Sequence, residues 1–241
     1  MTYCVTLHDL TMIFTDLNVS INSLKKLFLL FIIIVLITLY IKSLIKRLKI
    51  KRIGYLGEKE VRKYLRKLER KGYAVLNDLS LPLYDRITQI DHVVIAPTGI
   101  TVIETKNYKG RISGSSQNKY WVQTIGTEHH RFYNPLRQNH THANTIKYLL
   151  HKEGIYEFSI QNLIVFTSKR VYLQLEDEFY LPVIPYKRLK RWFKSKKRAP
   201  VTTDVEKVLE VLDKYRITDS RDRKKHIRYV KKKKLLTKLG I

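Results

Sequence analysis

An uninterrupted apolar segment near the start of the chain constrains its folding more than any other feature. Residues 27–41 read LFLLFIIIVLITLYI, interrupted only by Thr38. If the side chain of Lys42 snorkels towards water, the segment extends to Ile45, and a helix of that length would measure roughly 28 Å, close to the hydrocarbon core of a bilayer. Because it is apolar all round instead of along one stripe, it favours a transmembrane helix at 27–45 over a buried core helix.

Basic residues flank the apolar segment unequally. Lys25 and Lys26 precede it, whereas six lysines and arginines lie within residues 42–52. This bias predicts a single-pass protein of the cell membrane with residues 1–26 outside the cytoplasm, a basic juxtamembrane linker at 46–52, and the remainder in the cytoplasm. A cleaved signal peptide is the alternative, but no small-residue cleavage site follows the apolar segment.

The composition places further limits on the class of protein. The chain has 241 residues, a length sufficient for one domain with a hydrophobic core. Hydrophobic residues make up 44% of it, a larger fraction than disordered chains contain. Its single cysteine, Cys4, can neither close an intrachain disulfide nor supply a multi-thiolate zinc site. The 47 lysines and arginines against 21 acidic residues give a formal charge of +26, which indicates a polyanionic partner, either nucleic acid or anionic lipid.

The pattern after the apolar segment alternates between helices and strands. Amphipathic spacing predicts a helix at 58–71 that Gly72 ends, and another at 205–215. Asn134 and Pro135 are typical of a helix start and predict a helix that runs to about Lys152. Strands are expected at 73–79, 89–96, 99–107, 120–125, 163–167 and 171–175. This order predicts an α/β domain with a mixed central sheet over residues 53–186, followed by a basic helical segment at 187–241.

The segment most informative about function is QIDHVVIAPTGITVIETKNYKG, residues 89–110. Two β-branched runs flank a short Pro-Thr turn, which predicts a hairpin with Asp91 opposite Glu104 and their Cβ atoms about 5 Å apart. A bulge at Gly99 would instead shift the register by one residue. Glu104 and Lys106 share one face in either register, because strand side chains alternate.

Two carboxylates and an ammonium at the end of a hairpin are suited to metal-assisted phosphodiester hydrolysis. Asp91 and Glu104 supply the oxygen ligands that Mg²⁺ or Mn²⁺ prefers. Lys106 would orient or activate the attacking water and counter the charge of the transition state. Glu58 lies on the apolar stripe of the first helix, so it needs either a lysine partner or a place at the metal site. The alternative is an ordinary strand pair whose carboxylates are neutralised by nearby lysines.

This segment, together with GYLGE (54–58), Trp121 and NPLRQNHTHA (134–143), resembles the nuclease-related domain (NERD) family. That family belongs to the PD-(D/E)XK superfamily, so the resemblance implies a restriction-endonuclease-like sheet flanked by helices. It covers residues 53 to about 150, with weaker support to about 175.

The resemblance also implies roles for single residues. Asp91, Glu104 and the main-chain carbonyl after Glu104 would hold the metal with help from Glu58. Lys106 would be the catalytic lysine, and Gln138 would complete the site. Ile90 stands where the superfamily has proline, a departure that leaves the metal role intact.

Several aromatic residues could contact nucleic acid. Tyr108 and Lys109, which directly follow the strand that carries Lys106, are the expected contacts. Aromatic residues in strands are more often core, which is the expectation for Tyr120, Trp121 and Phe132.

The eight histidines include two near the expected site. His92 should point to the sheet face opposite Asp91 and is expected to be structural. His142 follows Gln138 by four residues and could face the site, although such histidines, like those at 129, 130 and 140, are more often surface groups or polar partners.

The end of the chain is strongly basic, with 21 lysines and arginines against 6 acidic residues from Lys187 onward. This segment could bind nucleic-acid phosphates, lie on anionic lipid, or remain a solvated tail.

The leading hypothesis is a membrane-anchored, metal-dependent nuclease that acts on DNA rather than RNA. A non-catalytic nucleic-acid-binding or tethering module of the same fold is the second, and a structural membrane protein that meets only lipid is the third. Double-strand cleavage by this fold would call for two active sites and hence a homodimer.

Overall fold

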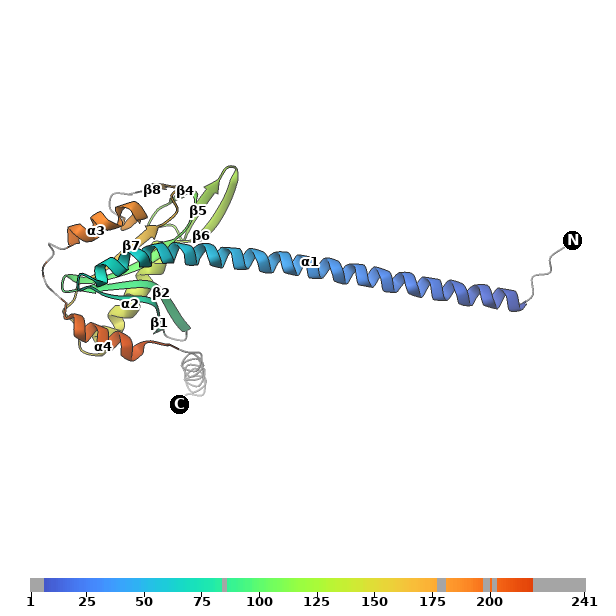
Figure 1. The fold of residues 1–241 in the computed structure, drawn as a ribbon, viewed down its shortest axis with the longest axis horizontal. Helices are drawn as coiled ribbons and strands as arrows, with labels where there is room; N and C mark the ends of the chain where they lie inside the picture. Colours follow the sequence, from blue (N-terminus) through green and yellow to red (C-terminus); the bar gives the residue numbers. More distant parts are fainter. Residues whose placement is uncertain (1–6, 84–85, 177–180, 197–199, 201–202, 219–241) are drawn as a thin grey trace. The chain divides into compact units, whose positions relative to one another are not determined.

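The computed structural model describes residues 7–83, 86–176, 181–196, 200 and 203–218 (Figure 1). The chain forms two compact units, Met1–Arg52 and Ile53–Ile241, and helix α1 (Leu7–Glu69) contributes to both. Part of the predicted basic segment, residues 219–241, lies outside the described residues.

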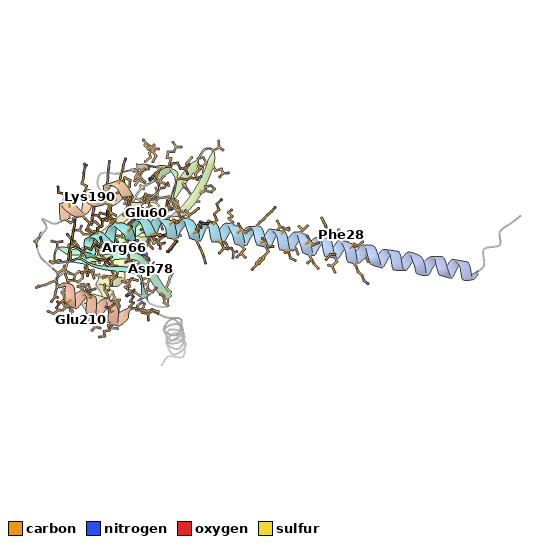
Figure 2. The ribbon with its side chains drawn as sticks, viewed as in Figure 1. Phe28, Glu60, Arg66, Asp78, Lys190 and Glu210 are labelled. Atoms are coloured by element: carbon orange, nitrogen blue, oxygen red, sulfur yellow. The ribbon has the colours of Figure 1, made fainter. Side chains whose placement is uncertain are left out.

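The described residues of the first unit form the N-terminal part of α1. The described helix from Lys25 onward is long and apolar enough to cross a membrane, by length and composition. Its apolar side chains are exposed, as Figure 2 shows for Phe28, which is 66% exposed.

Helix α1 continues without a break through Gly54 and Gly57, although the sequence predicts a helix that begins only at Glu58. A single glycine costs about 1 kcal/mol relative to alanine inside a helix, which is too little to end a long one. Gly57 has a packing role in addition. A Cβ atom at this position would lie 2.7 Å from both Asn107 Cβ and Thr167 Oγ1, so only glycine lets α1 approach these two strand ends.

Substitution of the two glycines by alanine should therefore change the free energy of unfolding in opposite directions. Gly57→Ala should lower the free energy of unfolding by about 1–3 kcal/mol, because the methyl group overpacks a close contact. Gly54→Ala should raise it by about 0.5–1 kcal/mol, because nothing lies within 4 Å of the new atom and the helix gains propensity. Denaturant melts of the full chain in mild detergent test the pair, and equal effects would contradict the packing role of Gly57.

The predicted mixed central sheet is present, in the order β1-β2-β3-β7-β9. The first three strands are antiparallel, and the last two run parallel to β3. Its strands are β1 (Ala74–Leu83), β2 (Arg86–Ala96), β3 (Gly99–Lys106), β7 (Ile160–Phe166) and β9 (Val183–Pro185). The β2–β3 register pairs Ala96 with Gly99 and His92 with Ile103, which confirms the two-residue turn and leaves no bulge at Gly99.

Helices cover both faces of this sheet. On one face, α2 (Pro135–Lys152) and α4 (Val205–Tyr215) pack on β1, β2 and β3. On the other face lie the last turns of α1 and helix α3 (Leu189–Lys196). Helices α3 and α4 thus belong to the hydrophobic cores of the second unit, even though they fall in the basic C-terminal part of the sequence.

A second mixed sheet, absent from the prediction, has the order β6-β5-β4-β8. Its strands are β4 (Gly110–Gly114), β5 (Tyr120–Ile125), β6 (Glu128–Tyr133) and β8 (Val171–Leu175). β5 and β8 are predicted by the sequence, whereas β4, β6 and β9 are not, and α3 falls within the helical segment expected at 187–241. β4 is short and bounded by glycines, and β6 is an exposed edge strand, EHHRFY, without apolar alternation.

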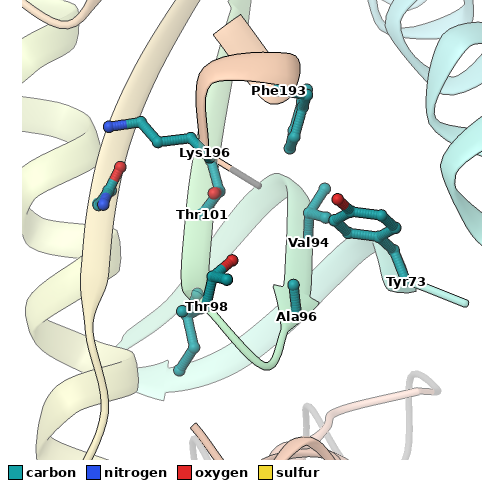
Figure 3. A pocket seen from close by; sticks show the side chains of 10 residues that line it. Tyr73, Val94, Ala96, Thr98, Thr101, Phe193 and Lys196 are labelled. Atoms are coloured by element: carbon teal, nitrogen blue, oxygen red, sulfur yellow. The ribbon is translucent and has the colours of Figure 1, made fainter. Parts of the chain in front are cut away.

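A small cavity of about 20 Å³ lies at the turn end of the β2–β3 hairpin, among Tyr73, Thr101, Phe193 and Lys196 (Figure 3). Such a volume holds about one water molecule. It is therefore too small for a nucleotide.

Candidate active site

Asp91 and Glu104 lie side by side where the β2–β3 hairpin ends. The β2–β3 pairing runs to His92 and Ile103, so Asp91 and Glu104 are the next residues of the two strands, in the register that the two-residue turn predicts. Asp91 is held there because its Oδ2 accepts a hydrogen bond of 2.7 Å from the main-chain N–H of Thr105. Ile100 and Val102 pack in the core with α2, so the alternation of β3 turns Glu104 towards that helix.

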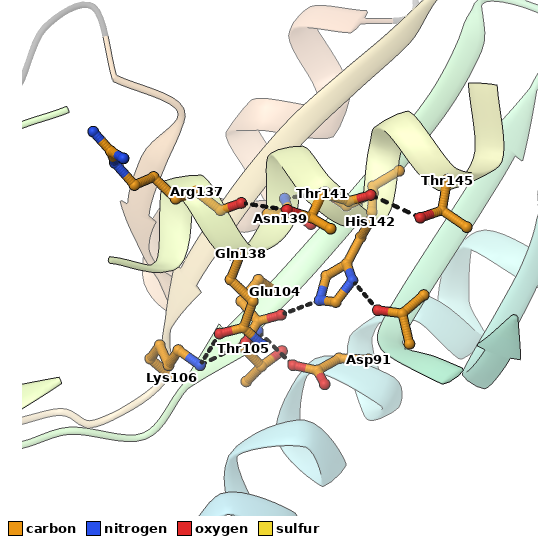
Figure 4. A network of polar contacts seen from close by, with 12 residues as sticks. Asp91, Glu104, Thr105, Lys106, Arg137, Gln138, Asn139, Thr141, His142 and Thr145 are labelled. Carbon is orange, nitrogen blue, oxygen red and sulfur yellow. Dashed lines mark hydrogen bonds and ion pairs between the residues drawn. The ribbon is translucent and has the colours of Figure 1, made fainter. Parts of the chain in front are cut away.

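Glu104, Lys106 and Gln138 form a connected polar group (Figure 4). Lys106 Nζ donates to Glu104 Oε1 at 2.5 Å and to Gln138 Oε1 at 3.1 Å. The Glu104 side chain is only 2% exposed and that of Lys106 16% exposed. The structure thus brings together the glutamate, the lysine and the helix glutamine that were picked out from the sequence.

The pKa values of this pair shift in the directions expected of an ion pair. Burial alone would raise the pKa of Glu104, but the neighbouring His142 and Lys106 outweigh it and lower that pKa below its usual value. Burial likewise opposes a charged Lys106, yet the carboxylate of Glu104 raises the pKa of the ammonium. Both groups are therefore charged near neutral pH.

The pKa of Asp91 is raised, whereas that of Glu104 is lowered. Burial raises its pKa most, the charge of Glu104 raises it further, and the hydrogen bond from Thr105 only partly offsets them, so the pKa reaches about 8. A carboxyl with this pKa is mostly protonated at neutral pH. A cation bound beside the two carboxyl groups would offset the effect of Glu104 and favour the ionised form of Asp91.

Glu58 reaches the same neighbourhood from α1. It is half-buried, and burial followed by the charge of Asp78 raises its pKa, while Arg62 and Lys106 lower it. Its charge also contributes to the raised pKa of Asp91. Glu58 thus lies inward as predicted and acts on the carboxylate pair electrostatically.

Asp78 on β1 is an acidic neighbour that the sequence analysis missed. It has a φ of +51°, uncommon for a residue other than glycine, and its carboxylate pairs with Arg62 of α1. The sequence gives no sign of this role, because a single aspartate within a strand does not change the hydrophobic pattern from which the strand is predicted.

His142 is the second residue that the sequence analysis underrated. It is buried, its Nδ1 lies 2.8 Å from the hydroxyl of Thr88, and its Nε2 lies 3.3 Å from Glu104 Oε2. The available signal was its spacing of four residues from Gln138, which places both side chains on one face of α2. The histidines at 129, 130 and 140 are exposed, as expected.

Helix α2 is fixed on the sheet by two buried asparagines. Asn134 caps the helix by accepting from the N–H of Leu136, and its amide nitrogen donates to the carbonyl of Asn118 at 2.7 Å. Asn139 donates to the carbonyls of Val102 and Leu163 on adjacent strands. These bonds hold Gln138 and His142 at a set height above β3.

The residues present fit a hydrated divalent cation. Glu104 Oε2 is buried, and its contact with His142 Nε2 at 3.3 Å lacks hydrogen-bond geometry, while the adjacent Asp91 carries a carboxyl whose ionisation is suppressed. In the part of the chain that the structure describes, no three Asp, Glu, His or Cys side chains form a ready-made cage. Mg²⁺ does not need one, because it keeps several waters and binds through one or two carboxylates.

The aromatic residues near the site differ in their exposure. Tyr108 is half-buried and meets the ring of Phe132 edge-on at 4.8 Å, whereas Lys109 is exposed. Trp121 is fully buried, as expected of a core residue, but Tyr120 is 40% exposed, so the expectation of a core position is wrong for it. The ring of Tyr120 meets that of Tyr133 edge-on at 6.1 Å, and the guanidinium of Arg131 lies 5.0 Å from its centre.

His92 has the structural role expected of it. Its Nδ1 lies 2.7 Å from Asn77 Oδ1 on the neighbouring strand, and the residue is fully buried. Burial, with a smaller effect of Arg62, lowers its pKa to about 4, which keeps the imidazole neutral.

Comparison with known proteins agrees with this geometry. The model of the nuclease-related domain matches residues 53–167, which contain the whole site. An uncharacterized protein of Bacillus anthracis is 34% identical over 208 residues, covering 84% of this chain and 95% of the relative. No solved structure matches the chain. The chain therefore belongs to the nuclease-related domain (NERD) family, and its mixed α/β fold is consistent with the PD-(D/E)XK superfamily.

Proposed function

We propose that this protein is a metal-dependent nuclease that hydrolyses phosphodiester bonds, with DNA as its preferred substrate. The observation that supports this most is the contact of Glu104 with Lys106 and Gln138, next to Asp91, in a member of a nuclease-related family. A module that only bound nucleic acid would gain nothing from carboxylates gathered where phosphate must approach, because like charges repel.

Asp91 and Glu104 would hold the cation, with the carbonyl of Thr105 and, less directly, Glu58 as further oxygen donors. A bound Mg²⁺ or Mn²⁺ polarises the phosphodiester and lowers the pKa of a bound water. Lys106 donates to Glu104 and Gln138, and an ammonium has three donors, so one N–H remains for a phosphate oxygen. Because Glu104 keeps Lys106 charged, the lysine serves as a fixed counter-charge for the transition state.

The anchor and the orientation are part of the same proposal. Residues 27–45 would span the cell membrane, and the excess of basic residues on their C-terminal side would keep the second unit in the cytoplasm. The basic C-terminal segment would hold nucleic acid or lie on anionic lipid near the site. Protease treatment of inverted vesicles tests the orientation, and a C-terminus that stays protected would refute it.

Cleavage by the purified full-length chain in mild detergent tests the activity and its metal. We expect plasmid and single-stranded DNA to be cut in Mg²⁺ or Mn²⁺ and to stay intact in EDTA, with RNA cut more slowly. Two active sites on a homodimer would yield linear plasmid without a nicked intermediate. Salt-sensitive binding to DNA with no cutting in either metal would instead favour the tethering module.

His142 should act as a positioning residue for Glu104. His142→Leu removes both polar contacts, and we expect at least about tenfold weaker stabilisation of the fold by Mg²⁺, read as the metal concentration that gives half the thermal shift. His142→Gln keeps a donor near the place of Nε2 and should restore most of the response. His142→Asn places its amide near Nδ1 only, so it is the matched control and should behave like the leucine variant.

A further inference from the structure

An open groove of about 500 Å³ lies at the end of the second sheet where β4 begins. Its walls come from the start of β4, the β5–β6 turn and the β7–β8 connection, and it is lined by Lys109, Gly110, Arg111, Thr124, Gly126 and Arg170 among others. Three of its side chains are cationic and no lining residue is acidic. The nearest acidic residue in the hairpin, Glu128, follows the turn and lies 3.2 Å from His130.

The main chain fixes these cations in place. The N–H of Gly110 donates to the carbonyl of Arg170 at 2.7 Å, and Gln123 Nε2 donates to the carbonyl of Lys109 at 2.9 Å. Gly110 has a φ of +82°, and a Cβ atom there would lie 2.3 Å from the carbonyl oxygen of Thr124, so glycine is required where β4 meets β5. The backbone of the groove is thus rigid.

The charges of the groove are free to meet a ligand. Lys109, Arg111 and Arg170 are all exposed, and within the described part of the chain none of them forms an ion pair. Isolated surface cations are common, but three cations around one concave surface raise the local concentration of an anion.

The groove follows the site closely along the chain. β3 and β7 run parallel up to the pair Lys106 and Phe166, and the same two chain segments pair again from Gly110 and Val171. Lys109 follows Lys106 by only three residues, which is at most about 10 Å of extended chain. A strand of B-form DNA rises about 3.4 Å per nucleotide along its axis, so this separation corresponds to at most about three nucleotides.

We propose that this groove binds the backbone phosphates of the nucleic-acid strand within about three nucleotides of the bond to be cut. This inference rests on the proposed nuclease function and adds the path of the strand, from Lys106 to Arg111 and Arg170. The contacts are to phosphate and read no bases, so the groove supplies affinity and direction and leaves sequence preference to other parts of the protein.

Binding measured in EDTA tests the groove without any need for cleavage. The variant is Lys109→Gln/Arg111→Gln/Arg170→Gln in the full-length chain in detergent. The control, Lys67→Gln/Lys147→Gln/Lys190→Gln, removes the same charge from exposed positions on three helices. The probes are labelled single-stranded DNA of two, four, six and twelve nucleotides.

We expect the parent and the control to gain affinity as the probe grows from two to six nucleotides, and the groove variant to lose most of this gain. Its affinity for the longest probe should fall at least about tenfold, and the slope of log affinity against log salt should fall by about 2, at about 0.7 per phosphate contact. Equal losses in the control and the groove variant would show that only net charge matters and would overturn the proposal. So would a loss of binding to anionic vesicles with DNA binding unchanged.

The result is distinguishable from a failure of the nuclease proposal. If the parent never cuts DNA but the groove variant shows the length-dependent loss of affinity, the groove proposal holds and the nuclease proposal fails. If the parent cuts DNA but the groove variant binds DNA as tightly as the parent, the nuclease proposal holds and the groove proposal fails.

Discussion

Breaking the Glu104–Lys106 pair should destabilise the protein more than any other single change at the site. Both groups are buried, so Lys106→Met leaves a carboxylate, and Glu104→Gln an ammonium, without its main partner. Each single variant should lower the free energy of unfolding by about 2–4 kcal/mol, as is usual when one member of a buried pair is removed.

The double variant Lys106→Met/Glu104→Gln should recover part of this loss, because no unpaired charge remains. We expect a coupling energy of at least about 1 kcal/mol between the two positions, measured by urea melts of the four proteins in the same detergent. Strictly additive losses would contradict the buried ion pair and would assign the effects of the two side chains to packing alone.

Asp91→Asn should stabilise the metal-free protein, in contrast to most changes in an active site. The folded-state pKa of Asp91, about 8, lies above its usual 3.8, so the neutral carboxyl stabilises the fold fully below about pH 4 and this contribution is lost as the pH rises through 8. Asparagine stays neutral at every pH and can still accept the hydrogen bond from Thr105.

In EDTA, the variant and the parent should therefore have similar stability near pH 4. At pH 9 the variant should be more stable by at least about 2 kcal/mol. Adding Mg²⁺ at pH 8 should reverse the order, because the cation stabilises only the protein that can bind it. A parent that is as stable as the variant at pH 9 in EDTA would contradict the crowding of Asp91 and Glu104.

Much of the second unit could be predicted from local signals in the sequence. The hairpin around the Pro-Thr turn has β-branched strands on both sides, so its register and the opposition of Asp91 and Glu104 follow from turn length alone. Helix α2 begins at the predicted cap, and its spacing places Gln138 towards the sheet.

The missed features depend on contacts between residues that are distant in the sequence. Asp78 joins the acidic group because β1 pairs with β2, and His142 meets Glu104 because Asn139 fixes α2 on the sheet. The strands β4 and β6 lack a strand-like hydrophobic pattern in the sequence. They form because β4 pairs with β5 and β8, and β6 pairs with β5. Gly57 appears as a helix break in the sequence, whereas its role is to let α1 approach Asn107.

The most direct test of the central claim is the rate of plasmid cleavage by the parent and by Asp91→Asn, purified identically and compared in Mg²⁺ and in EDTA. Because the variant should be at least as stable as the parent in EDTA, loss of its fold would not explain a loss of activity, and a contaminating nuclease would cut equally in both preparations. We expect the parent to cut only with metal and the variant to be slower by on the order of 10³ or more. Equal rates in the two proteins, or no cleavage by the parent in any metal, would contradict a catalytic role for the carboxylates.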